Sequence, residues 1–302
     1  MMRQAVSITG KILIGAGLLV LLFTAYQIWG TAIQESHAQD ALRTTLVSET
    51  NSQEVRHALA EADALNKLPT GPPVTAPRTT DPVEGEPVGD IRIPVIGVSQ
   101  VVVEGTNTPD LRKGPGHYIG TPLPGQNGNA GIAGHRTTYG HPFYNLDGVK
   151  VGDPIVLTTL QGIFVYDTTK SFVASPSDTT VISNAFANML TLTTCNPRFS
   201  ASTRLVVQAR LAHSQLFPNR GLPVGRLHAD PKSGDLAGNS NVELNQTLFW
   251  GFLVLVLLGS ILYAAWRFRR QRWLIWGVGT IGMLALLWFF FGAISPLLPA
   301  SF

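Results

Sequence analysis

Residues 189–197 read Met-Leu-Thr-Leu-Thr-Thr-Cys-Asn-Pro, and they contain the only cysteine of the chain. Threonine favours extended strands, and the Asn-Pro pair predicts a turn directly after the cysteine. A strand would therefore carry the Cys195 thiol to its end, where a rigid scaffold commonly presents reactive groups. A lone cysteine is also commonly a small buried core residue, so position alone leaves both interpretations open.

Comparable β-prone runs, separated by Gly, Pro, Asn and Asp, extend from about residue 89 to residue 212. Short strands with regular turn signals predict a closed barrel or a sandwich. In the last run Val207 and Ala209 alternate with Gln208 and Arg210, which predicts a strand with one buried face. The predicted strands are residues 91–95, 101–104, 131–133, 155–159, 163–167, 190–194 and 205–211.

Three apolar stretches, at residues 11–33, 248–266 and 273–298, approach the roughly 20 residues that cross a bilayer. They predict three transmembrane helices. Lys and Arg in short flanking segments stay in the cytoplasm, so Arg3, Lys11 and the four arginines of residues 267–272 predict a cytoplasmic N-terminus. Everything between the first and second helices would then lie outside the cell.

A cleavable signal peptide is the alternative for the first stretch, because residues 36–38 read Ser-His-Ala, a small-residue pattern. The apolar run is long for such a peptide, and the C-terminal hairpin would hold the protein on the membrane even after cleavage. The formal charge of +3 comes largely from basic residues beside the apolar segments, which indicates membrane topology and not a nucleic-acid-binding surface.

The predicted parts follow one another along the chain. They are a cytoplasmic tip and first transmembrane helix (1–36), a juxtamembrane helical stalk and Pro-rich spacer (37–88), a β-barrel (89–213), a polar linker (214–246) and a C-terminal transmembrane hairpin (247–302). The prolines of the spacer favour an extended, semi-rigid connection over packed structure.

The extracytoplasmic location makes Cys195 the residue to explain. A single cysteine cannot form an internal disulfide, and an unpaired thiol in an oxidising compartment must be shielded or used. A thiol nucleophile needs an imidazole to manage its proton. His135 follows the strand-like residues 131–134, whereas His117 and His141 lie in Gly- and Pro-rich loops, where solvated histidines are expected. The other histidines are in the stalk or at and beyond the end of the barrel.

An acyl-transfer site also needs a group that stabilises an oxyanion, and a guanidinium stays charged at any physiological pH. Arg204 begins the strand after Cys195 and could return beside the thiol; Arg198 and Arg210 are alternatives. A metal site made of His135, His141 and Asp147 matches no recognised ligand spacing, so no metal or other cofactor is expected.

The cysteine strand Thr191-Leu192-Thr193-Thr194-Cys195, together with Arg204, resembles the sortase signature, as does Gly134-His135-Arg136. The amino-acid sequences of residues 134–143, 114–118 and 195–197 resemble those of class E sortases of high-GC Gram-positive bacteria. The resemblance implies a closed β-barrel of about eight strands with short helices. It also implies that His135, Cys195 and Arg204 are catalytic and that Tyr118 and Thr194 bind substrate.

The resemblance further implies a membrane-anchored transpeptidase that cuts the Thr–Gly bond of an LAxTG- or LPxTG-like sorting signal on secreted proteins. The amine acceptor would belong to a peptidoglycan precursor or to a pilin, and the C-terminal membrane segment keeps a pilin-polymerising, class C-like role open. A papain-like peptidase is disfavoured because its cysteine precedes its histidine. A non-catalytic, membrane-tethered β-domain remains the alternative that would not need Cys195.

Overall fold

The computed structural model describes residues 2–49, 68–183, 188–217 and 244–295. The chain divides into a helical unit (residues 1–30 and 240–299) and a barrel unit (mainly residues 31–239). The predicted stalk beyond residue 49 and most of the predicted 214–246 linker lie outside the described residues.

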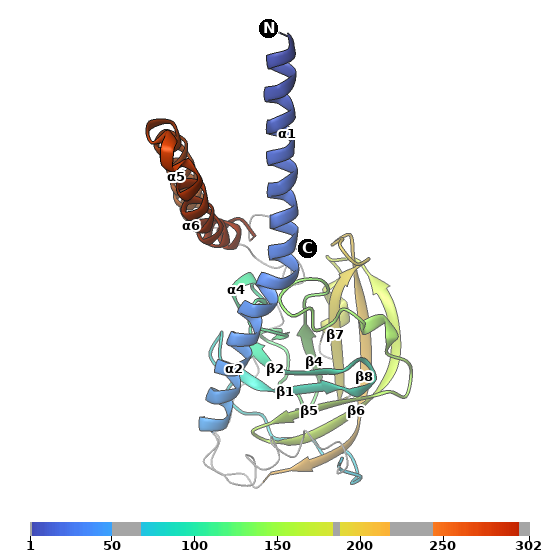
Figure 1. The fold of residues 1–302 in the computed structure, drawn as a ribbon. Helices are drawn as coiled ribbons and strands as arrows, with labels where there is room; N and C mark the ends of the chain where they lie inside the picture. Colours follow the sequence, from blue (N-terminus) through green and yellow to red (C-terminus); the bar gives the residue numbers. More distant parts are fainter. Residues whose placement is uncertain (1, 50–67, 184–187, 218–243, 296–302) are drawn as a thin grey trace. The chain divides into compact units, whose positions relative to one another are not determined.

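Eight strands are found among the described residues of the barrel unit: β1 (Pro87–Ile93), β2 (Val98–Glu104), β3 (Gly116–His117), β4 (Asn129–Ala133), β5 (Pro154–Thr159), β6 (Gly162–Ala174), β7 (Met189–Asn196) and β8 (Thr203–Leu216). They close into a barrel in the order β1-β2-β3-β4-β7-β8-β6-β5 (Figure 1). Most pairs are antiparallel, but β2 pairs with β3, and β4 with β7, in parallel. The predicted closed barrel is confirmed, and β3 was missed because two residues leave no periodic pattern.

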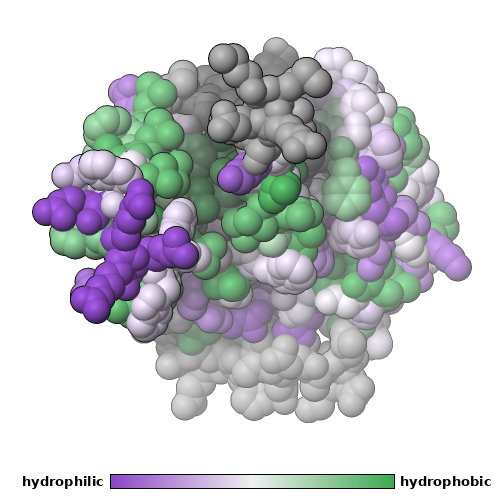
Figure 2. Space-filling view, turned by 45° about the horizontal axis from the view of Figure 1, so that its top comes forward, coloured by the Kyte–Doolittle hydropathy of each residue, from purple (hydrophilic) through white to green (hydrophobic). Residues whose placement is uncertain are grey.

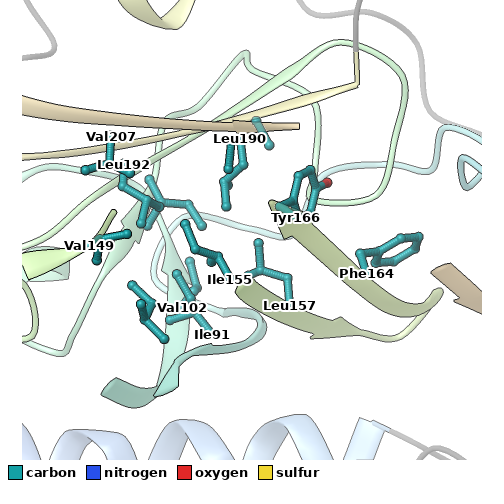
Figure 3. Packing of buried hydrophobic residues seen from close by; sticks show 14 of the residues in the cluster. Ile91, Val102, Val149, Ile155, Leu157, Phe164, Tyr166, Leu190, Leu192 and Val207 are labelled. Atoms are coloured by element: carbon teal, nitrogen blue, oxygen red, sulfur yellow. The ribbon is translucent and has the colours of Figure 1, made fainter. Parts of the chain in front are cut away.

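Short helical segments connect the strands: η3 (Pro94–Ile96), α4 (Thr108–Leu111), η4 (Leu146–Gly148) and η5 (Thr179–Ile182). Large aliphatic and aromatic side chains from all around the barrel fill its interior (Figure 3). Ile91, Ile155, Leu157 and Leu190 are completely buried. Burial of each such side chain contributes about 1.5–3 kcal/mol, so the interior is a rigid scaffold for the strand ends.

Strand β8 shows the predicted alternation only in part. Val207 and Ala209 are buried in the core and Arg210 is exposed, as predicted. Gln208, predicted to be on the open face, is buried because its side-chain amide donates to the Val181 carbonyl of η5 at 3.1 Å. A second layer therefore covers part of the outer face of the barrel.

Helix α2 (Thr31–Glu49) packs on the barrel unit. Its side chains Leu42 and Leu46 are buried against Val101 and Val103 of β2. The Gln39 amide donates to the Val101 carbonyl at 2.9 Å and accepts from the Val101 N–H at 2.7 Å, as a neighbouring strand would. The described part of the predicted stalk is thus attached to the barrel.

The Pro-rich segment before β1 also packs on the barrel. The Ala76 N–H donates to the Gly125 carbonyl at 2.8 Å, and Ala76 belongs to the hydrophobic core. The Ser214 hydroxyl donates to the Val74 carbonyl at 2.8 Å. For its described residues, the expectation of an extended spacer without packed structure was therefore wrong. The segment is extended, but strand edges and polar groups of the barrel bind its backbone.

The helical unit contains α1 (Met2–Ala25), the π-helical turn η1 (Tyr26–Gly30), α5 (Leu244–Arg267), η7 (Arg269–Gln271) and α6 (Arg272–Ile294). Three described helical segments are long and apolar enough to cross a membrane: Leu13–Ser48, Asn245–Arg267 and Arg269–Ile294. Their apolar side chains are largely uncovered; Leu248 and Val278, for example, are 65% and 71% exposed. Hydrophilic side chains gather at the end of the α5–α6 hairpin that carries the arginine-rich connection (Figure 2).

Candidate active site

Cys195 and Arg204 are direct partners across the antiparallel pair β7–β8. Side chains alternate along each strand, so Cys195 shares the outer face of β7 with Thr193, and Arg204 shares the outer face of β8 with Val206. Opposite residues of an antiparallel pair have Cβ atoms about 4.5–5.5 Å apart. The pairing therefore holds the thiol and the guanidinium side by side, as the position of Arg204 at the start of the next strand predicted.

His135 reaches the same end of the barrel through the parallel pair β4–β7. Ala133 is the register partner of Thr193, and the next link is the hydrogen bond from the Gly134 N–H to the Thr193 carbonyl at 3.0 Å. Two residues beyond these partners come His135 on one chain segment and Cys195 on the other. Parallel strands end at the same edge of a sheet, so this register places the imidazole and the thiol at one edge.

Burial favours the neutral form of both groups of this pair. Burial of His135 and, to a smaller extent, the positive charge of Arg112 lower the pKa of the imidazole from 6.5 to about 4. Burial raises the pKa of the Cys195 thiol, and the nearby Arg204 and Arg136 guanidinium groups offset only part of that effect. The site therefore holds a thiol and a neutral imidazole at one edge, and the positive charge of Arg204 favours the thiolate form of Cys195.

Arg136 holds the backbone of the cysteine loop. One terminal nitrogen of its buried guanidinium donates to the Cys195 carbonyl at 3.1 Å and to Asn196 Oδ1 at 2.8 Å. Its other terminal nitrogen lies 3.3 Å from Asp147, which also binds Arg198 at 2.8 Å. Arg198, considered as an oxyanion group, is thus engaged in an ion pair. Arg210 is exposed in the middle of β8, opposite Met189 at the end of β7 away from Cys195. The only sequence signal for Arg136 was its place beside His135.

The two predicted substrate-binding residues lie next to the cysteine, and both have internal partners. The Thr194 hydroxyl donates to the Gly134 carbonyl at 2.7 Å, which ties the cysteine strand to the residue before His135. The Tyr118 hydroxyl lies 2.8 Å from the Thr193 hydroxyl, and the Tyr118 ring packs with Ile182 and Val206. Tyr118 lies on the outer face of β7 with Thr193, whereas Thr194 points to the other face and fixes the strand to Gly134.

His117 is not the solvated loop histidine that the sequence predicted. It is completely buried on β3, with Nδ1 2.9 Å from the Glu104 carboxylate and Nε2 3.0 Å from the Pro122 carbonyl. Burial lowers the pKa of His117, but the Glu104 carboxylate, the Pro122 carbonyl and Asp81 together outweigh it, and the net pKa is raised. A buried carboxylate is unfavourable without a partner, and this need explains why the histidine is inside.

His141 is exposed in a loop, as predicted, and its φ is positive, at 40°. Asp147, the third member of the metal alternative, binds Arg136 and Arg198. Among the described residues no group of three or more His, Cys, Asp or Glu side chains is arranged to hold a metal ion.

A closed mixed β-barrel that carries a cysteine, a histidine and an arginine at one end has the groups that a cysteine enzyme uses for acyl transfer, and comparisons with known proteins identify the family. The Sortase domain model matches residues 91–212. Sortase SrtE1 of Streptomyces coelicolor is 30% identical over 222 residues, which cover 68% of this chain and 57% of that protein. Sortase SrtE2 of the same organism is 28% identical over 231 residues, covering 70% of this chain and 84% of that protein.

In the solved structure of sortase E from Streptomyces avermitilis the chain is 38% identical to this one, with a TM-score of 0.42, and the match covers 45% of this chain and 93% of that one. The chain belongs to the sortase family. Its similarity to these relatives is of the class E kind, as the wording of the sequence motifs indicated.

Proposed function

We propose that this protein is a membrane-anchored sortase that joins secreted proteins to an amine on the cell surface. Cys195 would attack the carbonyl carbon of the Thr–Gly bond in an LAxTG- or LPxTG-like sorting signal. The thiol proton passes to His135, and the new C–S bond forms as the Thr–Gly C–N bond breaks. His135 then protonates the departing glycine amine, leaving the threonine acyl group on Cys195 as a thioester.

The second step reverses these roles. An incoming amine attacks the thioester carbonyl while His135 accepts its proton, and the thiolate that leaves is protonated again. Arg204 would donate hydrogen bonds to the oxyanion that forms in each step. The peptidoglycan precursor is the favoured source of this amine, and a pilin lysine is the alternative.

The observation that carries this proposal is the register pairing of Cys195 with Arg204 beside the end of β4. A non-catalytic adhesion domain would not require a thiol and a guanidinium on the same face next to an imidazole. Membership of the sortase family supports the same conclusion.

The proposal places the barrel outside the cell. Arg3 and Lys11 would keep the N-terminus in the cytoplasm, as would the arginine-rich connection between α5 and α6. With α1, α5 and α6 as membrane spans, the barrel and α2 lie on the opposite side from these charges. Protease protection of the α5–α6 connection in sealed, right-side-out vesicles, with digestion of the barrel, is the expected result.

The activity is tested with the full chain in detergent or nanodiscs. LAxTG and LPxTG peptides are incubated with triglycine as the amine, and the products are identified by mass spectrometry. We expect cleavage between Thr and Gly and transfer of the acyl part to triglycine. Absence of cleavage in both peptides, with a correctly folded protein, would contradict the proposed function.

The lowered pKa of His135 predicts that peptide cleavage remains active at an unusually acidic pH. Because the imidazole stays neutral down to a pKa of about 4, it can accept the thiol proton at mildly acidic pH. We expect kcat/KM for peptide cleavage to fall with an apparent pKa near 4. At pH 5.5 an unshifted histidine would be only about 10% neutral, whereas His135 would remain mostly neutral. An inflection near 6.5, with the protein folded throughout by circular dichroism, would be the contrary outcome.

A further inference from the structure

Arg112, at the end of α4, is a charged group beside the candidate site that has no partner for one edge of its guanidinium. The Nε and Nη2 atoms are buried and have no hydrogen-bond acceptor in the part of the chain that the structure describes. These two nitrogens lie on the same edge of the planar group, which is the edge that binds a carboxylate with two parallel hydrogen bonds. Buried charged groups normally have hydrogen-bond partners, so a ligand that binds this edge would remove an unfavourable feature of the site.

Each of the other three arginines around the site has an acceptor for at least one terminal nitrogen, although Arg136 Nε is also buried without one. Arg136 binds the cysteine loop and Asp147, and Arg198 binds Asp147. Arg204 donates to the Ala201 and Thr203 carbonyls. The contrast singles out Arg112 as the one of these four arginines whose Nε and Nη2 are both buried without an acceptor among the described residues.

The place of Arg112 connects it with His135. Its guanidinium carbon lies 5.5 Å from the centre of the Tyr139 ring, and the His135 ring centre lies 5.1 Å from the same point. Stacking on Tyr139 occupies a face of the guanidinium and leaves its edge unused. His135 Nε2 is likewise buried without a hydrogen-bond partner among the described residues. The influence of Arg112 on the pKa of His135 agrees with this proximity.

We propose that Arg112 binds a carboxylate carried by the amine acceptor, so that the acceptor amine is presented to His135 and the thioester. This inference rests on the proposed function and names the chemistry of its second substrate. In that reaction, His135 exchanges protons with the amine side of the bond. A group bound near Tyr139, which both Arg112 and His135 approach, would therefore lie on the side of the departing amine in the first step and of the incoming amine in the second. An acceptor with an amine and a nearby carboxylate fits both groups at once.

The test compares acceptors that differ only in this carboxylate. Glycine, diglycine and triglycine are each supplied as the free acid and as the C-terminal amide, and the ratio of their transfer efficiencies is measured with the full chain. In the native protein we expect a preference for the acid of about tenfold or more for at least one length, as a charge-assisted bidentate pair should provide. In Arg112→Gln the preference should fall to about twofold or less. Using a ratio within each variant cancels any general loss of activity.

Two further variants sharpen the result. Arg112→Lys keeps the positive charge but lacks the two parallel N–H donors of the guanidinium, so we expect it to retain only part of the preference for acid over amide acceptors. Lys150→Gln removes one exposed positive charge on a loop outside the site and should leave the preference as in the native protein. Equal transfer to acids and amides by the native protein, or a preference that survives in Arg112→Gln, would overturn the proposal.

Two further experiments ask whether the carboxylate belongs to the acceptor or to the leaving segment, and whether it binds without catalysis. Substrate peptides with Glu or Gln directly after the Gly of the Thr–Gly bond test the leaving segment. If Arg112 distinguished Glu from Gln there but not acids from amides among the acceptors, the assignment to the acceptor would be overturned. Calorimetric binding of the same acids and amides to Cys195→Ala requires no turnover. Tighter binding of an acid that is lost in the Cys195→Ala, Arg112→Gln double variant supports the carboxylate site even if the native protein cuts neither peptide. Only the proposed function would then fail.

Discussion

Replacing Cys195 with alanine is expected to remove sorting-signal cleavage, lowering kcat by roughly 10⁴-fold or more, because no other group can form the acyl intermediate. Cys195 is half-buried at the end of β7, and its backbone carbonyl is held by Arg136 whatever side chain is present. The barrel should therefore keep its melting temperature. The measurement is peptide cleavage followed by mass spectrometry, with hydroxylamine added to trap the thioester as a hydroxamate.

The companion variant Cys195→Ser keeps the size of the side chain and tests the chemistry alone. A serine hydroxyl is a far weaker nucleophile than a thiolate, so we expect no hydroxamate from this variant either. Cleavage by Cys195→Ala at the native rate would exclude a cysteine mechanism. It would favour the non-catalytic β-domain if the surface attachment of secreted proteins were also unchanged.

Replacing Arg204 with glutamine is expected to lower kcat by about 10²–10³-fold, the usual effect of removing an oxyanion donor. A second effect has the same sign, because the positive charge of Arg204 partly offsets the raised pKa of the Cys195 thiol. Without it, the thiolate should form less readily. Alkylation of the thiol by iodoacetamide across a pH series measures this second effect separately from turnover.

Arg210→Gln is the matched control for Arg204→Gln, because both arginines are on β8 and only Arg210 is exposed. We expect it to cleave within about threefold of the native rate, as surface substitutions usually do little. Arg204 also donates to the Ala201 and Thr203 carbonyls of its own loop, so melting temperatures must be compared. Equal losses in the two variants, or a loss fully explained by unfolding, would contradict an oxyanion role for Arg204.

The features that could be predicted from the sequence are those with a local signal. The run that ends at Cys195 indicated a strand, and β7 spans Met189–Asn196. The position of His135 after residues 131–134 indicated a strand end, and the parallel register of β4 with β7 agrees with it. Long apolar runs indicated the three helices that are long enough to span a membrane. Each of these signals depends on neighbours within a few residues.

The misjudged features depend on partners that are distant in sequence. His117 is in a Gly- and Pro-rich stretch typical of an exposed loop, yet its partner Glu104, 13 residues away, holds it inside the barrel. The Pro-rich segment around Ala76 is typical of a spacer, but it binds the Gly125 backbone and the Ser214 hydroxyl. The composition of a segment predicts its local conformation. It does not predict whether another part of the barrel will bind and bury the segment.

By itself, the sequence determined the strands other than β3, the apolar helices and the short list of residues able to perform thiol chemistry, because periodicity and residue type are local properties. Only the tertiary structure decided which of those residues meet. Closure of the barrel places β7 between β4 and β8, so that Cys195 faces Arg204 and lies beside the end of the His135 strand. It also decided that Arg112, which belongs to no motif, lies against the same Tyr139 ring as the imidazole. The physical reason is that strand register and burial are set by the whole barrel, and they determine both proximity and pKa.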